Sequence, residues 1–316
     1  MSFSYYLTHP AIRNRILRLL RHPVVTFNRL LKLLDRDQEV ESRALLRNLA
    51  LMLPECVRVK YSDELRYLES VDVPASMFPY ERVRPSAELV IKRDPRNGLV
   101  YVVHRGEKFY YPRGTSEEEL ADAYRYYVEV EGILGTGCLT RSPHSYVSPM
   151  FSVEAGDVLV DIGCSDALFA FDNAEKAGHI YLIEAWKRWI PTLKASFAPY
   201  ADKTSIVMRY VGDGSDGRSV RLEEVLKDSA TSKFFIKMDI EGAEREVLRS
   251  VVSFLKTHQV KLAVCVYHRQ DDAAVISNLL TEIGFQVSYS DGYVLTRANG
   301  IHYPYFRHGV IYARNY

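Results

Sequence analysis

Cysteine is scarce in this sequence: its 316 residues include four, and no two of them form a CxxC pair. Small secreted domains stapled by disulfides, and zinc ribbons, both need cysteines at close and regular spacing. The scarcity therefore predicts reduced cysteines, a cytosolic protein and no zinc site. A chain of this length can bury a sizeable core without disulfides or bound metals.

Long apolar runs are also missing. No charge-free stretch approaches the roughly 18 residues that a membrane-spanning helix needs. The apolar N-terminal stretch is interrupted by arginine every few residues, which is not the pattern of a secretory signal. We therefore expect a globular protein with a cytoplasmic location.

An excess of one charge is missing as well, because 41 Lys and Arg balance 40 Asp and Glu. A globally basic nucleic-acid-binding protein is thereby disfavoured, and we expect no nucleic-acid partner. Residues 1–32 nevertheless carry six basic and no acidic side chains, with apolar helical faces on either side of Pro23. We expect this segment to pack on its own protein with the basic face in water. The alternative is peripheral contact with an anionic membrane surface.

The length suggests two units, an N-terminal extension of residues 1–130 and a larger domain of residues 131–316. In the extension, residues 38–53 predict a helix, and Ser116 with Glu119 forms a capping box that begins another helix. Asn-Gly and Gly turns join three short apolar segments, which predicts a β-meander. These segments are residues 88–92, 99–104 and 108–111.

From about residue 157 short apolar segments alternate with helical or mixed stretches, which is typical of a doubly wound α/β domain. The last two strands follow one another with no helix between them, so we expect one of them to be antiparallel. In such sheets the ligand binds beyond the carboxyl ends of the strands. The predicted strands are 157–162, 179–184, 205–211, 233–239, 260–267, 285–290 and 309–314.

The first predicted strand ends in Asp161-Ile162-Gly163-Cys164-Ser165-Asp166, a turn of small residues that would let backbone amides approach a ligand closely. A complete GxGxxG motif is absent, which disfavours a nicotinamide-dependent oxidoreductase. Glu184 ends the second strand 23 residues after Asp161, a spacing that suits an acid binding the hydroxyls of an adenosine ribose. Asp213 follows the third strand, where it would either bond an adenine amino group or stabilise its own turn.

Acidic residues cluster where the fourth strand ends, with Asp239, Glu241 and Glu244 inside six residues. Glu244 is explained by the positive end of the following helix. Asp239 and Glu241 lie at the strand tip, where they can orient a hydroxyl, act as a general base or hold a divalent cation. His268 follows the fifth strand and can accept a hydroxyl proton near neutral pH. His144, in the loop entering the domain, is a further candidate.

These segments together resemble the FkbM-type family of S-adenosylmethionine-dependent methyltransferases. The resemblance covers about residues 140–316 and rests on Val160-Asp161-Ile162-Gly163, on the IKxDxEGxE pattern of residues 236–244, and on Tyr267-His268. It implies the class I methyltransferase fold, which is Rossmann-like with a seven-stranded, mostly parallel sheet whose last strand is antiparallel.

The resemblance also implies S-adenosylmethionine as cofactor and O-methylation of a hydroxyl on a sugar, a polysaccharide or glycolipid, or a natural product. Glu184 would then take the ribose hydroxyls. The candidates for cofactor binding are Asp161, Gly163, Ser165, Asp166, Glu184 and Asp213, and those for catalysis are Asp239, Glu241 and His268.

Two questions stay open at the level of the sequence. The acceptor proton would be removed by His268 or by the Asp239–Glu241 pair, directly or through a bound divalent cation. The family's first motif usually reads DxGANxG, whereas this chain has Ser165 for Asn and Ala167 for Gly. This departure supports the alternative of a non-catalytic relative that binds an adenosyl ligand or a glycan in a biosynthetic complex.

Overall fold

The computed structural model describes residues 55–70, 88–135, 141–215, 217–227, 229, 233–295 and 306–316. The basic N-terminal segment and the helix expected over residues 38–53 lie outside this part of the chain. Packing of the basic segment on its own protein, and the alternative of membrane contact, therefore both stay predictions. Among the described residues, none of the helices combines the length and apolar character needed to cross a membrane.

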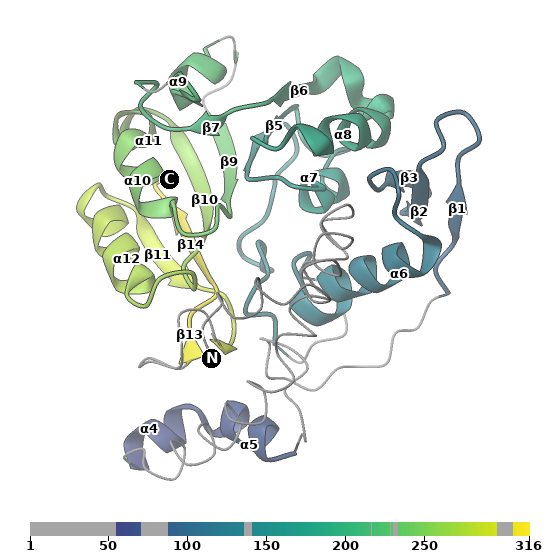
Figure 1. The fold of residues 1–316 in the computed structure, drawn as a ribbon. Helices are drawn as coiled ribbons and strands as arrows, with labels where there is room; N and C mark the ends of the chain where they lie inside the picture. Colours follow the sequence, from purple (N-terminus) through teal and green to yellow (C-terminus); the bar gives the residue numbers. More distant parts are fainter. Residues whose placement is uncertain are drawn as a thin grey trace, which may run out of the picture.

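A seven-stranded sheet forms the centre of the molecule, in the spatial order β11-β14-β10-β9-β4-β5-β6 (Figure 1). This is a Rossmann arrangement with one antiparallel strand, β14 (Val310–Arg314), inserted between β10 and β11. The fold expected from the sequence, a class I methyltransferase fold, is thereby confirmed. The parallel strands are β4 (Val158–Ile162), β5 (His179–Ile183), β6 (Thr204–Val207), β9 (Lys233–Met238), β10 (Gln259–Cys265) and β11 (Gln286–Tyr289).

Two predicted elements differ from the structure. The strand expected over residues 205–211 is two strands, because the chain leaves the sheet after Val207 and β7 (Tyr210–Val211) pairs with β8 (Ser219–Val220) instead. The helix expected after the acidic cluster of the fourth strand is interrupted at Val251, whose backbone angles are not helical although its side chain is buried. The two resulting helices are α10 (Glu244–Ser250) and α11 (Val252–Thr257).

Both faces of the sheet are covered, because β4 and most of β9 and β10 carry buried residues on either side. One face packs against α9 (Leu222–Val225), α10, α11 and α12 (Asp272–Glu282). The other packs against α7 (Leu168–Asp172) and α8 (Ile190–Ser196), which lie on the opposite side in Figure 1.

The predicted β-meander is confirmed as β1 (Ile91–Arg93), β2 (Val100–His104) and β3 (Glu107–Tyr110). The capping box of Ser116 and Glu119 is also present, at the start of α6 (Glu117–Arg125). The meander shares a core with the sheet domain, since the rings of Phe109 and Phe171 lie 5.1 Å apart. The division at residues 130 and 131 stays a prediction.

Several short elements complete the described chain. A π-helix, η1 (Tyr126–Glu131), continues α6 and ends at Gly132, which adopts a left-handed conformation. Tyr61, between α4 (Glu55–Lys60) and α5 (Ser62–Ser70), packs against Phe306 at the start of β13 (Phe306–Arg307). The remaining elements are η2 (Lys187–Trp189), η3 (Ala198–Lys203) and β12 (Val294–Leu295), which pairs with β13.

Gly163 provides a test of how closely β4 and β9 pack where they end. Its φ is +72°, and a Cβ there would lie 2.1 Å from the Asp239 carbonyl oxygen. Gly98 has the same φ and nothing within 4 Å of its Cβ position, so it is a matched control. We expect Gly98→Ala to lower the free energy of unfolding by about 1 kcal/mol, from the left-handed backbone alone. Gly163→Ala should lower it by about 3 kcal/mol or more, because overpacking is added. Equal losses in urea unfolding would contradict this close packing.

Candidate active site

The carboxyl ends of β5, β4 and β9 are neighbours in the sheet, which brings Glu184, Asp161 and Asp239 to one edge. Between β4 and α7 the backbone is left-handed at Gly163, Ser165 and Ala167, with φ values of 72°, 52° and 62°. Such conformations are strained for Ser and Ala, and strain of this kind clusters at ligand-binding sites.

Glu184 ties this turn to the end of β5. One of its carboxylate oxygens accepts a hydrogen bond from the Ser165 amide at 3.0 Å, and the other accepts from the Trp186 amide at 2.7 Å. The structure thus brings together two residues that the sequence singled out separately. Each carboxylate oxygen has a second lone pair for a ligand hydroxyl.

Asp161 lies below the turn, almost fully buried, and forms an ion pair of 3.0 Å with Lys237 of β9. The Lys237 ammonium also donates a hydrogen bond to the Gly163 carbonyl at 2.9 Å. Burial raises the pKa of Asp161, and Lys237 opposes that shift. Burial alone would lower the pKa of Lys237, but Asp161 and Asp239 raise it above its usual range, so the lysine is charged.

The other two cofactor candidates have different surroundings. Asp166 accepts hydrogen bonds from the Tyr111 hydroxyl and the Leu168 amide, both at 3.0 Å, and burial raises its pKa to about 6. Asp213 is exposed, and one of its oxygens accepts from the amide and hydroxyl of Ser215. Asp213 therefore stabilises its own turn, and its contact with an adenine stays a prediction.

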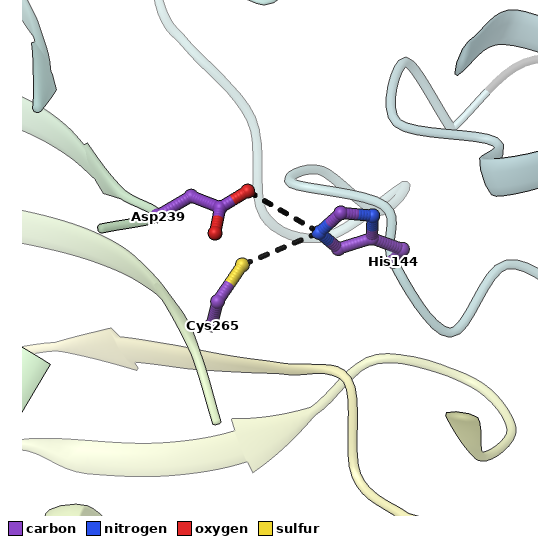
Figure 2. Close-up of side chains that lie close together, drawn as sticks. All are labelled: His144, Asp239 and Cys265. Atoms are coloured by element: carbon purple, nitrogen blue, oxygen red, sulfur yellow. Dashed lines mark hydrogen bonds and ion pairs between the residues drawn. The ribbon is translucent and has the colours of Figure 1, made fainter. Parts of the chain in front are cut away.

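Asp239, at the tip of β9, lies between two histidines. On one side His144 Nε2 is 3.5 Å from Asp239 Oδ2 and 3.3 Å from Cys265 Sγ (Figure 2). The Tyr146 hydroxyl donates to the same Asp239 oxygen at 2.8 Å. His144 Nδ1 faces a carboxylate oxygen of Glu131 at 2.9 Å, and Glu131 is the last residue of η1.

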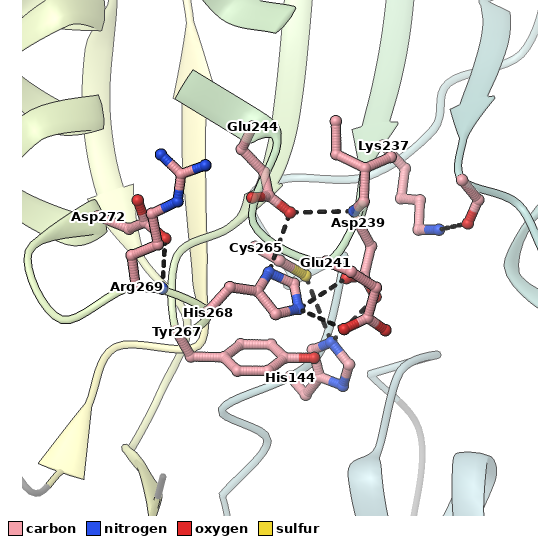
Figure 3. Close-up of polar contacts among 12 residues, drawn as sticks. His144, Lys237, Asp239, Glu241, Glu244, Cys265, Tyr267, His268, Arg269 and Asp272 are labelled. Atoms are coloured by element: carbon pink, nitrogen blue, oxygen red, sulfur yellow. Dashed lines mark hydrogen bonds and ion pairs between the residues drawn. The ribbon is translucent and has the colours of Figure 1, made fainter. Parts of the chain in front are cut away.

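On the other side His268 Nε2 is 3.5 Å from Asp239 Oδ1 and 3.6 Å from Glu241 (Figure 3). His268 Nδ1 lies 2.9 Å from the fully buried carboxylate of Glu244, which also accepts from the Ile240 amide. The three sequence-predicted catalytic residues, Asp239, Glu241 and His268, are therefore brought together. Each of the two histidines has a glutamate on Nδ1 and Asp239 near Nε2.

The charges of this cluster depend on one another. Burial would raise the pKa of Asp239, but a hydrogen bond from His144 and the charge of Lys237 hold it well below its usual range. Burial likewise opposes the charged form of both histidines. Cys265 and Glu131 nevertheless raise the pKa of His144, and Glu244 and Asp239 raise that of His268. The neighbouring charge of Asp239 raises the pKa of Glu241. Asp239 is thus a stable carboxylate.

Exposure separates the groups that can meet a substrate from those behind them. The side chain of Glu241 is 91% exposed and that of Asp239 is 18% exposed, whereas His144 is only 4% exposed. Glu241 also has a left-handed backbone, with φ at 56°. Solvent therefore reaches Glu241 freely and Asp239 and His268 (10% exposed) only in part, whereas His144 is buried.

Sequence reasoning missed four residues of the site: Lys237, Glu131, Tyr146 and Cys265. Lys237 had a usable signal, because a lysine inside an apolar strand is almost never buried without a charged partner. Glu131, Tyr146 and Cys265 had none, since their local sequence is ordinary.

Comparison with known proteins identifies one domain. Residues 201–287, which are less than half of the chain, match the model of the methyltransferase FkbM domain. This match includes the IKxDxEGxE segment and confirms the family resemblance that the sequence suggested. A search of curated proteins finds no match.

Similar solved structures include methyltransferase FkbM from Methylobacillus flagellatus KT. It is 22% identical with a TM-score of 0.42, and the match covers 52% of this chain and 45% of that one, so this chain spans less than half of that protein. Precorrin-6y C5,15-methyltransferase from Geobacter metallireducens GS-15 is 15% identical with a TM-score of 0.35, and the match covers 52% of this chain and 81% of that one. A Streptococcus mutans protein in complex with SAH is 12% identical with a TM-score of 0.35, and the match covers 51% of this chain and 90% of that one.

Asp166 should make the stability of the protein depend on pH. Its pKa is about 6 in the folded state and about 4 when unfolded, so the folded state binds the proton more tightly. Stability is therefore lost as the pH rises through this interval, by up to about 3 kcal/mol. Asp166→Asn should remove this loss. Urea unfolding of the unaltered protein and of Asp166→Asn at pH 4 and pH 7 measures this loss. If the two proteins differ in their free energy of unfolding by the same amount at both pH values, the assignment is contradicted.

Proposed function

We propose that this chain is an S-adenosylmethionine-dependent O-methyltransferase whose acceptor is a hydroxyl of a sugar, a polysaccharide or glycolipid, or a natural product. The observation that carries the proposal is His268, held by the buried Glu244 and facing Asp239 and Glu241 at the open edge of the sheet. This group stands next to the strained turn at the end of β4.

The turn and the end of β5 suit an adenosyl cofactor. The turn with left-handed residues at Gly163, Ser165 and Ala167 follows β4, and the fixed carboxylate of Glu184 follows β5. Both lie at the carboxyl ends of neighbouring strands, where such sheets bind their ligands. Ser165 and Glu184 would hold the methionine and ribose parts of the cofactor. When bound, it supplies a methyl group on a sulfonium, which is the source of the driving force.

His268 is the best candidate for the base. Glu244 beside Nδ1 keeps the proton on that nitrogen and leaves Nε2 to accept another. An aliphatic hydroxyl is a poor nucleophile at neutral pH, so removing its proton as the new bond forms accelerates the transfer. The proton would pass to Nε2, and Asp239 and Glu244 would stabilise the resulting imidazolium.

The exposed carboxylate of Glu241 supports a hydroxylated acceptor. It lies 3.6 Å from His268 Nε2 yet extends into solvent, so it can accept a hydrogen bond from the acceptor while His268 takes the reacting proton. A charged acceptor site of this kind favours polar molecules such as sugars over apolar ones.

Binding of S-adenosylhomocysteine tests the cofactor. Glu184→Gln removes the negative charge but keeps a hydrogen-bond acceptor, and we expect the dissociation constant to rise at least about ten-fold. Glu175→Gln is the control, because this exposed residue lies in the turn before β5, at the opposite edge of the sheet. Titration calorimetry measures both variants. Absence of binding by the unaltered protein would refute the cofactor and leave a glycan-binding relative as the alternative.

Replacement of His268 tests the base. His268→Ala should lower turnover by about 10²- to 10⁴-fold while leaving affinity for S-adenosylhomocysteine unchanged. His179→Ala is a suitable control, since His179 lies at the start of β5 and bonds Ser205. Transfer of labelled methyl groups to a panel of sugars, glycans and hydroxylated natural products provides the readout. In the unaltered protein the rate should rise with pH through the raised pKa of His268, and full activity of His268→Ala would exclude this residue as base.

A further inference from the structure

Three side chains of different chemistry converge on the inner side of Asp239 (Figure 2). One ligand atom each from His144, Asp239 and Cys265 lies within 4.8 Å of the other two. His144 Nε2 is 3.3 Å from Cys265 Sγ and 3.5 Å from Asp239 Oδ2. Ligand atoms bonded to zinc at about 2.0–2.3 Å stand about 3.3–3.6 Å apart at tetrahedral angles. The two measured separations match this spacing.

Glu131 orients the imidazole of His144 as a metal ligand requires. Its carboxylate lies 2.9 Å from Nδ1, which fixes a proton on that nitrogen and directs Nε2 at Asp239 and Cys265. Metal-binding histidines almost always have such a carboxylate or carbonyl partner on the second nitrogen. Glu131 ends a π-helix, a rare conformation that is frequent at functional sites.

We propose that His144, Asp239 and Cys265 bind one transition-metal ion, with zinc as the best match. Imidazole, carboxylate and thiolate are the ligands that zinc takes, whereas Mg²⁺ and Ca²⁺ prefer oxygen ligands alone. The hydroxyl of Tyr146 lies beside these ligands, 3.3 Å from His144 Nε2. This proposal does not depend on methyl transfer, because binding of the ion can be measured without any methyl acceptor.

A second group, Asp239, Glu244 and His268, has a comparable geometry but is less suited to the ion. Glu244 accepts a hydrogen bond from the Ile240 amide and faces His268 Nδ1, so it has the same relation to His268 that Glu131 has to His144. Only the group around His144 has a further soft ligand, Cys265.

The charges of the buried site are compatible with a divalent cation. The ion would bring two positive charges, and two of its ligands would balance them: the carboxylate of Asp239 and the thiolate that Cys265 forms when its proton leaves to solvent. The nearby ammonium of Lys237 is neutralised by Asp161 at 3.0 Å.

Titration of the chelator-treated, full-length protein with Co²⁺ tests the proposal. We expect one equivalent to bind, with visible bands of a tetrahedral site and a near-ultraviolet band from thiolate-to-cobalt charge transfer, both removed by added Zn²⁺. Cys265→Ser should abolish the charge-transfer band, and His144→Ala should weaken binding at least about ten-fold. Cys164→Ser is the matched control, since Cys164 is the other buried cysteine in the described part of the chain, and it should keep the band.

Two outcomes would overturn the proposal. The first is the lack of stoichiometric binding to the unaltered protein, which would leave an ordinary hydrogen-bonded cluster. The second is loss of the ion in His268→Ala but not in Cys265→Ser, which would place it in the other group. X-ray absorption of the zinc-loaded, unaltered protein avoids any folding defect of the variants. One sulfur scatterer at about 2.3 Å is expected, and only nitrogen and oxygen scatterers would refute the site.

Discussion

The ion pair between Asp161 and Lys237 is the interaction on which the rest of the site depends. It joins β4 to β9 in the middle of the sheet at 3.0 Å, and the same ammonium holds the Gly163 carbonyl at 2.9 Å. Two buried charges are tolerated only as a well-bonded pair, so removing either partner would leave an expensive uncompensated charge. The pair therefore fixes both the turn between β4 and α7 and the start of the segment that carries Asp239.

Asp239 connects the two halves of the site because its oxygens face different ways. Oδ1 lies toward His268 and the open edge of the sheet, while Oδ2 lies toward His144, Tyr146 and the interior. Deprotonation of an acceptor would use the outer side, and the proposed metal ion would use the inner side. An ion bound there would add positive charge next to the base. Both proposals thus concern one carboxylate without competing for the same oxygen.

Residues before the sheet domain also contribute to this edge. Tyr111, which follows the meander, donates to Asp166 in the turn after β4, and Glu131 at the end of η1 orients His144. The loop that holds His144 packs closely against the residue that precedes β14. A Cβ on that residue, Gly309, would lie 1.8 Å from the Pro143 carbonyl oxygen. The described residues between β3 and β4 therefore help to hold the site in place.

Local sequence patterns predicted the fold correctly, and they also singled out the residues that the structure gathers on the outer side of Asp239. Short apolar strands, turn residues and a capping box are local patterns, and the acids after β4, β5 and β9 follow from the rule that ligands bind at the strands' carboxyl ends. Only the tertiary structure brought His144 to Cys265, 121 residues away, and Glu131 to His144. Such contacts leave no local pattern, because they arise when a loop, a π-helix and a central strand pack together. For the same reason, cysteine spacing predicted no zinc site, since the proposed ligands lie on three separate segments.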